Sequence, residues 1–270
     1  MVEAMGKSPS NSEVRYNKAG GQRQPAEVFW RNVFSGVSLP ISLPIRQTQD
    51  LDLKAIPQST EHAIPVSESV ACGIRALAQE HHVSPEAILW GAWAILLSRY
   101  SGEQAVIFGA AGTLQVSPAE HEDPCDPIPL RMHIAEDEPV LSWLRTVDAQ
   151  LAELRQHWPT PLKKIREWCD LPAERPLFES LVAISTSPPT PHSELAVTMP
   201  MLVTVVWADN MVLRLRYRQD LFDAGTMIRL LGHYQRLLEG MAAEPERRIS
   251  TLELLTAAER RQLLVEWNQT

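Results

Sequence analysis

Two adjacent histidines come closest to a catalytic pattern in this chain. His81 and His82 are followed by an acidic residue, Glu86. An imidazole can remove a proton from a substrate near neutral pH when it is partly buried and held in position by a neighbour. However, Ser84 and Pro85 are typical of the cap and first residue of a helix, and an acid in the first turn suits the helix dipole. We therefore predict that both histidines lie in an exposed turn between two helices and that neither is catalytic.

The other chemical patterns in the chain are weaker. Residues 109–112 (Gly-Ala-Ala-Gly) lack the lysine and the following helix of a phosphate-binding loop, and no Gly-x-Ser-x-Gly nucleophile motif occurs. Residues 120–123 (Glu-His-Glu-Asp) would point alternately to opposite faces of an extended segment, which favours a solvated loop over a metal site. Cys72, Cys125 and Cys169 fit neither a zinc site nor a disulfide framework. We predict no catalytic, cofactor-binding or metal-binding residue.

The composition is that of a globular protein with a mildly acidic surface. Of the 270 residues, 44% are hydrophobic and 21% charged, and the formal net charge is −8. This negative charge argues against nucleic acid and anionic membranes as partners. The most apolar run, residues 87–97, is too short to span a bilayer, and the polar first 24 residues have no secretory signal. We expect a cytoplasmic protein.

Helices and strands alternate in the hydrophobic pattern, which predicts a mixed, layered α/β fold. Residues 1–25 are polar and are predicted to form a flexible tail. Residues 39–64 are predicted to be extended and loop-like, and residues 186–200 to be irregular. The predicted helices lie around residues 29–34, 67–81, 84–97, 140–157, 161–168 and 223–241, and from residue 256 onward. The predicted strands are residues 105–110, 128–134, 177–184, 201–207 and 211–217.

Three features of this pattern carry more specific predictions. The helix at 84–97 is apolar almost all round, so it must be buried between other layers, and its tryptophans belong to the core. The last two strands flank Asp209 and Asn210, which predicts a hairpin with a tight turn. Thr256 and Glu259 have the spacing of a capping box at the start of the last helix.

The C-terminal part of the chain resembles the end of a condensation domain of nonribosomal peptide synthetases. This resemblance is carried by residues 217–223 (Tyr-Arg-Gln-Asp-Leu-Phe-Asp), the helix after them, and the closing residues 267–270 (Trp-Asn-Gln-Thr). The closing residues resemble the linker into an adenylation domain. Further segments agree in the family's order, so that the resemblance covers residues 26–270: Phe29-Trp30-Arg31, Val83-Ser84-Pro85, residues 93–102, Pro129-Leu130-Arg131, Arg155-Gln156-His157 and residues 175–181.

The resemblance implies a single chloramphenicol-acetyltransferase-like lobe, with a central mixed sheet and flanking helices. Such domains have two lobes, and this chain is similar to the C-terminal one, over residues 26–250, followed by a linker at 251–270 that leads toward an adenylation domain. The catalytic HHxxxDG motif of the family belongs to the other lobe, and the histidines at 81 and 82 lie where the family has a glycine-containing turn. Its GxFxN motif is replaced by residues 122–126, where Pro124 should change the local structure.

The resemblance therefore indicates a truncated, non-catalytic condensation-type domain at the start of a synthetase subunit. Its role would be that of a structural platform or contact surface next to an adenylation domain. The alternative is half of an active enzyme that forms peptide bonds between carrier-bound thioesters once it is paired with an N-terminal lobe, with His82 as its base; a third possibility is a lobe excised from a complete domain.

Cofactors and partners follow from the same resemblance. No cofactor is expected to bind directly, although the parent assembly line would use phosphopantetheine on carrier proteins. The expected partners are the adenylation domain and carrier protein of the same synthetase and, in addition, an upstream synthetase protein. Because a lone lobe would expose the face that normally meets its partner lobe, we predict either polar residues on that face or self-association.

Overall fold

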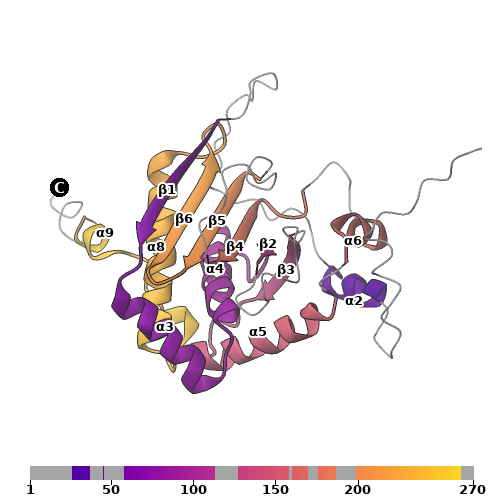
Figure 1. The fold of residues 1–270 in the computed structure, drawn as a ribbon, viewed down its shortest axis with the longest axis horizontal. Helices are drawn as coiled ribbons and strands as arrows, with labels where there is room; N and C mark the ends of the chain where they lie inside the picture. Colours follow the sequence, from indigo (N-terminus) through magenta and orange to yellow (C-terminus); the bar gives the residue numbers. More distant parts are fainter. Residues whose placement is uncertain are drawn as a thin grey trace, which may run out of the picture.

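The structure is a computed structural model that describes residues 26–36, 45, 58–112, 127–157, 160–169, 176–186 and 199–262. Its centre is a six-stranded sheet in the order β1-β6-β5-β4-β2-β3 (Figure 1). The pairs β2–β4 and β4–β5 are parallel and the others are antiparallel, so the predicted mixed sheet is confirmed. The strands are β1 (Ser59–Pro65), β2 (Ala105–Ala111), β3 (Ile128–His133), β4 (Ser180–Ser185), β5 (Met201–Trp207) and β6 (Met211–Arg218).

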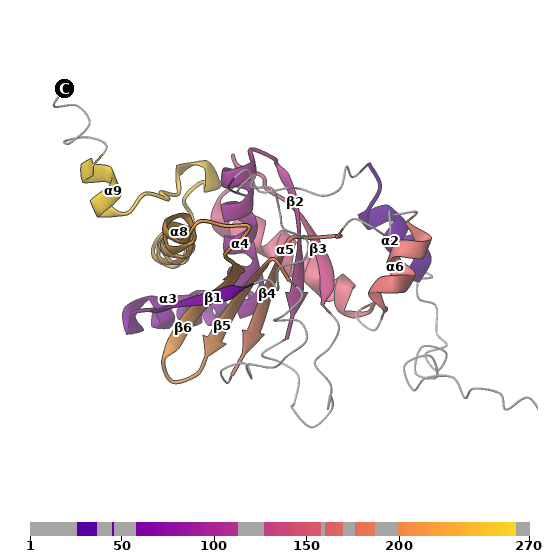
Figure 2. The same cartoon turned by 90° about the horizontal axis from the view of Figure 1, so that it is seen from above.

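The helices flank this sheet, as predicted. α4 and α8 pack directly against it, with α3 and α5 beside them, whereas α2 and α6 lie side by side beyond β3 (Figure 2). Their bounds are α2 (Ala26–Val33), α3 (Glu68–His81), α4 (Pro85–Ser101), α5 (Val140–Arg155), α6 (Leu162–Trp168), α8 (Ala224–Ala243) and α9 (Ala257–Arg261), with a short 3₁₀ helix, η2, at Ile249–Thr251. Within the described part of the chain, no helix combines the length and hydropathy needed to cross a membrane.

Helix α4 is the centre of the core. Every residue from Glu86 to Ser98 is buried, which confirms the prediction made from its all-round apolar pattern. Trp93 is fully buried and donates a hydrogen bond from Nε1 to Ser180 Oγ on β4 (3.2 Å). The Tyr234 hydroxyl on α8 donates to the Leu89 carbonyl (3.0 Å). These two bonds tie α4 to the sheet on one side and to α8 on the other.

The predicted hairpin between β5 and β6 is confirmed. The strands pair antiparallel from Met201 opposite Tyr217 to Trp207 opposite Met211, with Asp209 and Asn210 in the turn between them. Along β6, fully buried residues alternate with half-buried ones, so one face of the strand meets the core. The half-buried residues on its other face are Val212, Arg214, Arg216 and Arg218.

The sequence missed one strand. Residues 39–64 were expected to be extended and loop-like, but Ser59–Pro65 form β1, an edge strand antiparallel to β6. No residue of β1 is fully buried, so the strand carries none of the apolar alternation by which a strand is recognised in a sequence. Its position depends on pairing with a segment about 150 residues away, because Ser59 lies opposite Arg218. The prediction of a tail at 1–25 lies outside the described residues.

Candidate functional site

The two histidines lie at the junction between α3 and α4, as predicted, but only His82 is exposed, since His81 is half-buried. His81 is the last residue of α3, and His82 caps that helix with left-handed backbone angles of φ 54° and ψ 42°. The backbone N–H of His82 donates to the Ala78 carbonyl, which closes the helix end. The His82 side chain is exposed, and nothing in the described residues orients its imidazole. The turn thus uses His82 for its backbone conformation, which closes the end of α3.

The residues after the histidines start the next helix. The Ser84 hydroxyl accepts a hydrogen bond from the Ala87 amide (3.2 Å), which makes Ser84 the N-cap of α4. Asp148 on α5 accepts hydrogen bonds from both the amide and the hydroxyl of Ser84. Glu86 is fully buried in the first turn. The acidic position of the apparent motif is therefore part of a helix start, as predicted.

The glycines at 109 and 112 allow close packing and do not form a phosphate loop. A Cβ atom at Gly109 would lie only 2.8 Å from Cζ of Phe178, whose ring covers this strand. Gly112 has a positive φ of 77° and sits against the backbone of Ile184. Both glycines are thus required by neighbouring segments of the sheet.

Arg131 and His157, which belong to the segments that carry the family resemblance, hold α2 in place. Arg131 on β3 donates from Nη1 to the carbonyls of Val33 (2.9 Å) and Ser35 (3.0 Å) at the end of α2. His157 is buried after α5, and its ring stacks on Phe29 of α2 with 4.2 Å between ring centroids. These side chains therefore hold an N-terminal helix against the lobe.

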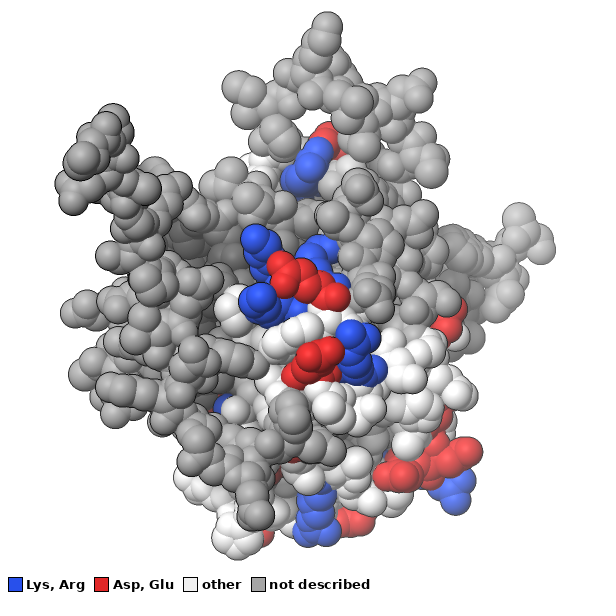
Figure 3. Space-filling model, turned by 90° about the vertical axis from the view of Figure 1, so that its right-hand side faces the viewer, with Lys and Arg blue, Asp and Glu red and all other residues white. Residues whose placement is uncertain are grey.

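The surface at the α2 and α6 end carries charges of both signs. Figure 3 shows acidic and basic atoms side by side there, and ion pairs join Glu27 to Arg31 (3.0 Å) and Lys164 to Glu167 (3.2 Å). Among the residues described, no group of three or more His, Cys, Asp or Glu could hold a metal ion. Residues 120–123, which were considered as a metal site, lie outside the described residues, as does Pro124.

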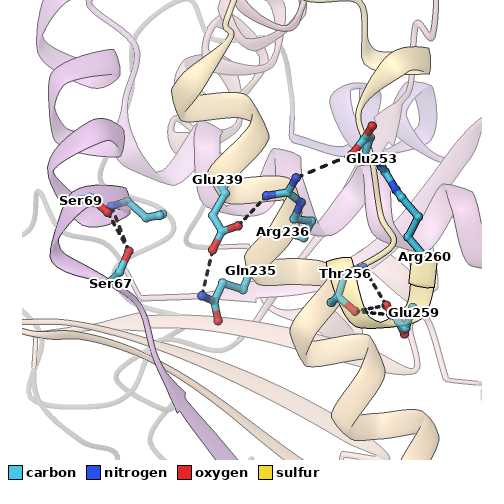
Figure 4. A network of polar contacts seen from close by, with 10 residues as sticks. Ser67, Ser69, Gln235, Arg236, Glu239, Glu253, Thr256, Glu259 and Arg260 are labelled. Atoms are coloured by element: carbon cyan, nitrogen blue, oxygen red, sulfur yellow. Dashed lines mark hydrogen bonds and ion pairs between the residues drawn. The ribbon is translucent and has the colours of Figure 1, made fainter. Parts of the chain in front are cut away.

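A cluster of ion pairs joins the C-terminal segment to α8. Arg236 on α8 forms ion pairs with Glu239 (3.1 Å) and with Glu253 (3.7 Å), and Glu253 also pairs with Arg260 of α9 (Figure 4). A hollow of about 530 Å³ lies beside this cluster, between the start of α3, the end of α8 and residues 244–253. The chain after α8 thus turns back and lies along the helix that precedes it.

The predicted capping box starts α9. The Glu259 amide donates to Thr256 Oγ1 (3.2 Å), and Glu259 Oε2 accepts from the Thr256 amide and from its hydroxyl (2.8 Å each). The same carboxylate lies 3.1 Å from Nε2 of His233 on α8. Burial tends to raise the pKa of Glu259, but the hydrogen bonds from Thr256 and His233 outweigh it, so the pKa is lowered and the carboxylate is ionised at neutral pH.

A third element joins this contact. The Tyr100 hydroxyl, at the end of α4, lies 2.9 Å from Nδ1 of His233. Burial raises the pKa of Tyr100 to about 12, so its hydroxyl keeps the proton at neutral pH. Sequence reasoning found the capping box from its spacing of three residues, but it missed His233 and Tyr100. No local pattern marks them, because 133 residues separate the two.

The comparisons with known proteins agree on one family. Residues 12–264 match the family model described as condensation domain. One of the proteins that make up the linear gramicidin synthase of Brevibacillus parabrevis is 29% identical in an alignment 267 positions long, which covers 92% of this chain and 5% of that protein. Chondramide synthase cmdD of Chondromyces crocatus is 31% identical in an alignment 265 positions long, which covers 90% of this chain and 7% of that protein. The chain thus spans a small fraction of the length of these relatives.

Solved structures show the same fold. The four-domain nonribosomal peptide synthetase AB3403 has a TM-score of 0.73 at 17% identity, over 92% of this chain and 21% of that one. The X-domain from teicoplanin biosynthesis has a TM-score of 0.70 at 23% identity, over 85% of this chain and 57% of that one. The same X-domain has also been solved in complex with OxyB. At these identities the likeness concerns the fold.

Proposed function

The chain belongs to the condensation domain family of nonribosomal peptide synthetases, and from this premise we propose that it is a non-catalytic member. Its role in this proposal is that of a structural platform and contact surface next to an adenylation domain. It holds no cofactor itself, and phosphopantetheine reaches the assembly line on carrier proteins. The partners are the adenylation and carrier domains of the same synthetase, with an upstream synthetase protein as a further contact.

The observation that carries this proposal is the docking of the C-terminal segment on α8. A segment that is pinned by a capping box, a histidine contact and an ion-pair cluster leaves the lobe in one direction. A domain joined to such a segment would be held at a set orientation. A flexible linker would allow a wide range of orientations, so this docking is a feature expected of a platform.

Exposed apolar side chains on α8 and just before α9 support a protein contact. The described residues include three exposed large hydrophobic side chains, and two of them belong to these elements. Ile228 on α8 is 50% exposed, and Leu255, just before α9, is 38% exposed. Exposed apolar residues near a polar rim are typical of protein-binding surfaces. The X-domain complex with OxyB supports the idea further, because it is a domain of this fold that holds a protein partner.

The arrangement around the histidines supports the non-catalytic part of the proposal. A general base needs an imidazole whose orientation is fixed by a neighbour. His82 is exposed at a helix end, and its backbone conformation accounts for its place there. Helix caps on both sides of the turn account for His82 and Ser84. The residues from His81 to Glu86 therefore need no catalytic role to explain their positions.

The test uses the chain joined to the adenylation domain of its own synthetase. We expect that deleting residues 1–262 lowers the soluble yield and the rate of amino-acid activation. Replacing Ile228 and Leu255 together by glutamate should have the same effect in smaller measure. Val28→Glu is the matched control, because Val28 is 42% exposed but lies on α2. Equal yield and equal activation after the deletion would rule out the platform.

A second arm of the test addresses catalysis. The chain is supplied with an N-terminal lobe and with aminoacyl thioesters on phosphopantetheine, and peptide formation is measured by mass spectrometry. We expect no transfer that depends on His82. Transfer that is lost in the His82→Ala variant would overturn the non-catalytic proposal and establish the paired half-enzyme instead.

A further inference from the structure

Glu259 takes part in two structures at once. Its carboxylate closes the capping box with Thr256, which forms the first turn of α9, and it also contacts His233 on α8. One side chain therefore both starts the helix and docks it. If α9 unfolds, the carboxylate loses the backbone amide that positions it toward His233.

His233 connects this carboxylate to the core. Its side chain is largely buried on α8, with Tyr100 of α4 on one ring nitrogen and Glu259 of α9 on the other. α4 is the central buried helix of the lobe. The contact thus runs from the rigid core, through α8, to the last described helix.

We infer that Tyr100, His233 and Glu259 form a latch that holds α9 on the lobe and so sets the direction in which the chain leaves it. The contacts of the latch do not depend on the proposed function, whereas its use in orienting a neighbouring domain does. Glu259 makes docking cooperative with helix formation, because the same carboxylate serves both.

The partners determine where the histidine proton sits. An ionised carboxylate can only accept hydrogen bonds, so Nε2 of His233 carries the hydrogen that faces Glu259. In the neutral ring, Nδ1 then has a free lone pair and accepts a hydrogen bond from the Tyr100 hydroxyl. Every polar group of the latch is satisfied in this arrangement, which is the condition for a half-buried polar cluster to stabilise a structure.

The ion pairs beside the latch are expected to contribute less than the His233 contact to holding α9 on the lobe. Glu253 and its partners Arg236 and Arg260 are each more than one-third exposed, and exposed ion pairs are screened by water and salt. The histidine is largely buried, so loss of its hydrogen bond to a charged group has a larger effect. The two sets of contacts can therefore be separated by mutation.

The experiment measures hydrogen exchange of the backbone amides of residues 259–262 by NMR in the full chain. In H233Q the amide nitrogen reaches the place of Nε2 and keeps the contact with Glu259. In H233N the shorter side chain reaches only the place of Nδ1. We expect exchange in α9 to be about tenfold faster in H233N, as for the loss of one hydrogen bond to a charged group, and nearly unchanged in H233Q. E253Q, the control for the ion pairs, should change it less than twofold.

Three results would overturn the latch. These are unchanged α9 exchange in H233N, release of α9 by E253Q to the same extent, or a ¹⁵N spectrum in which the His233 ring is protonated at Nδ1 and not at Nε2. Urea unfolding of each variant separates local release from a loss of global stability: if α8 itself is weakened, exchange rises throughout α8 and α4 as well, which also counts against the latch.

The latch and the platform fail separately. Exchange is read in the chain by itself, without an adenylation domain. If the latch is present but deleting the lobe does not change amino-acid activation, only the platform is refuted. If the lobe is needed for activation but α9 exchange is unchanged in H233N, only the latch is refuted.

Discussion

Replacing His82 by glycine should make this lobe more stable. His82 has a left-handed backbone conformation, with φ 54° and ψ 42°, which costs a residue with a Cβ atom about 1–2 kcal/mol. Glycine avoids this cost but loses about 0.5–1 kcal/mol more conformational entropy on folding. Because the His82 side chain is exposed, little else is lost. The net expectation is a gain of about 0.5–1 kcal/mol in the free energy of unfolding.

Urea unfolding followed by circular dichroism measures this gain as a higher midpoint at an unchanged slope. His81→Gly is the matched control, since His81 is the last residue of α3 and has ordinary helical geometry. Glycine at that helical position should lower the free energy of unfolding by about 0.5 kcal/mol. The two neighbouring substitutions should thus have opposite signs. A loss of stability in His82→Gly would refute the reasoning, because it would mean that the imidazole makes a contact that stabilises the turn.

Two further predictions concern packing and alkaline stability. Gly109→Ala should lower the free energy of unfolding, measured in urea, by about 1–3 kcal/mol, because its Cβ would lie 2.8 Å from Cζ of Phe178. The double variant Gly109→Ala/Phe178→Leu should recover part of this loss. If the losses of the two single variants simply add, the steric explanation is contradicted. Burial raises the pKa of Tyr100 to about 12 and that of Tyr234 further, whereas an unfolded tyrosine ionises near about 10. Stability conferred by the protonated phenols is therefore complete below pH of about 10 and is lost as pH rises toward about 12. Tyrosinate absorbance of these residues should appear together with the loss of circular dichroism, and its earlier appearance in the folded chain would contradict the prediction.

The sequence predicted the elements whose signals are local. The N-cap at Ser84, the buried helix α4, the β5–β6 hairpin and the capping box at Thr256 all depend on residues a few positions apart. Side chains three and four residues apart share a helix face, and a tight turn joins neighbouring strands. These patterns are therefore readable without knowledge of the rest of the chain. The interpretation of the histidines at 81 and 82 as a turn follows from the same local rules.

The edge strand β1 and the packing glycines could not be predicted in this way. β1 has no fully buried residue, and it is defined by hydrogen bonds to β6. The sequence assigned no role to Gly109 and Gly112, whose roles depend on Phe178 and on the backbone of Ile184. In both cases the deciding partner lies on a strand that is distant in the sequence.

The latch combines one contact that the sequence predicts with others that depend on the fold. The pairing of Glu259 with Thr256 could be predicted from the residues alone, since a capping box needs only a spacing of three residues. The contact of this carboxylate with His233, and that of Tyr100 with the other ring nitrogen, depend on how α4, α8 and α9 pack together. The reason is physical: α4 and α8 are brought together by burial of their apolar faces, and the positions of their polar side chains follow from that packing.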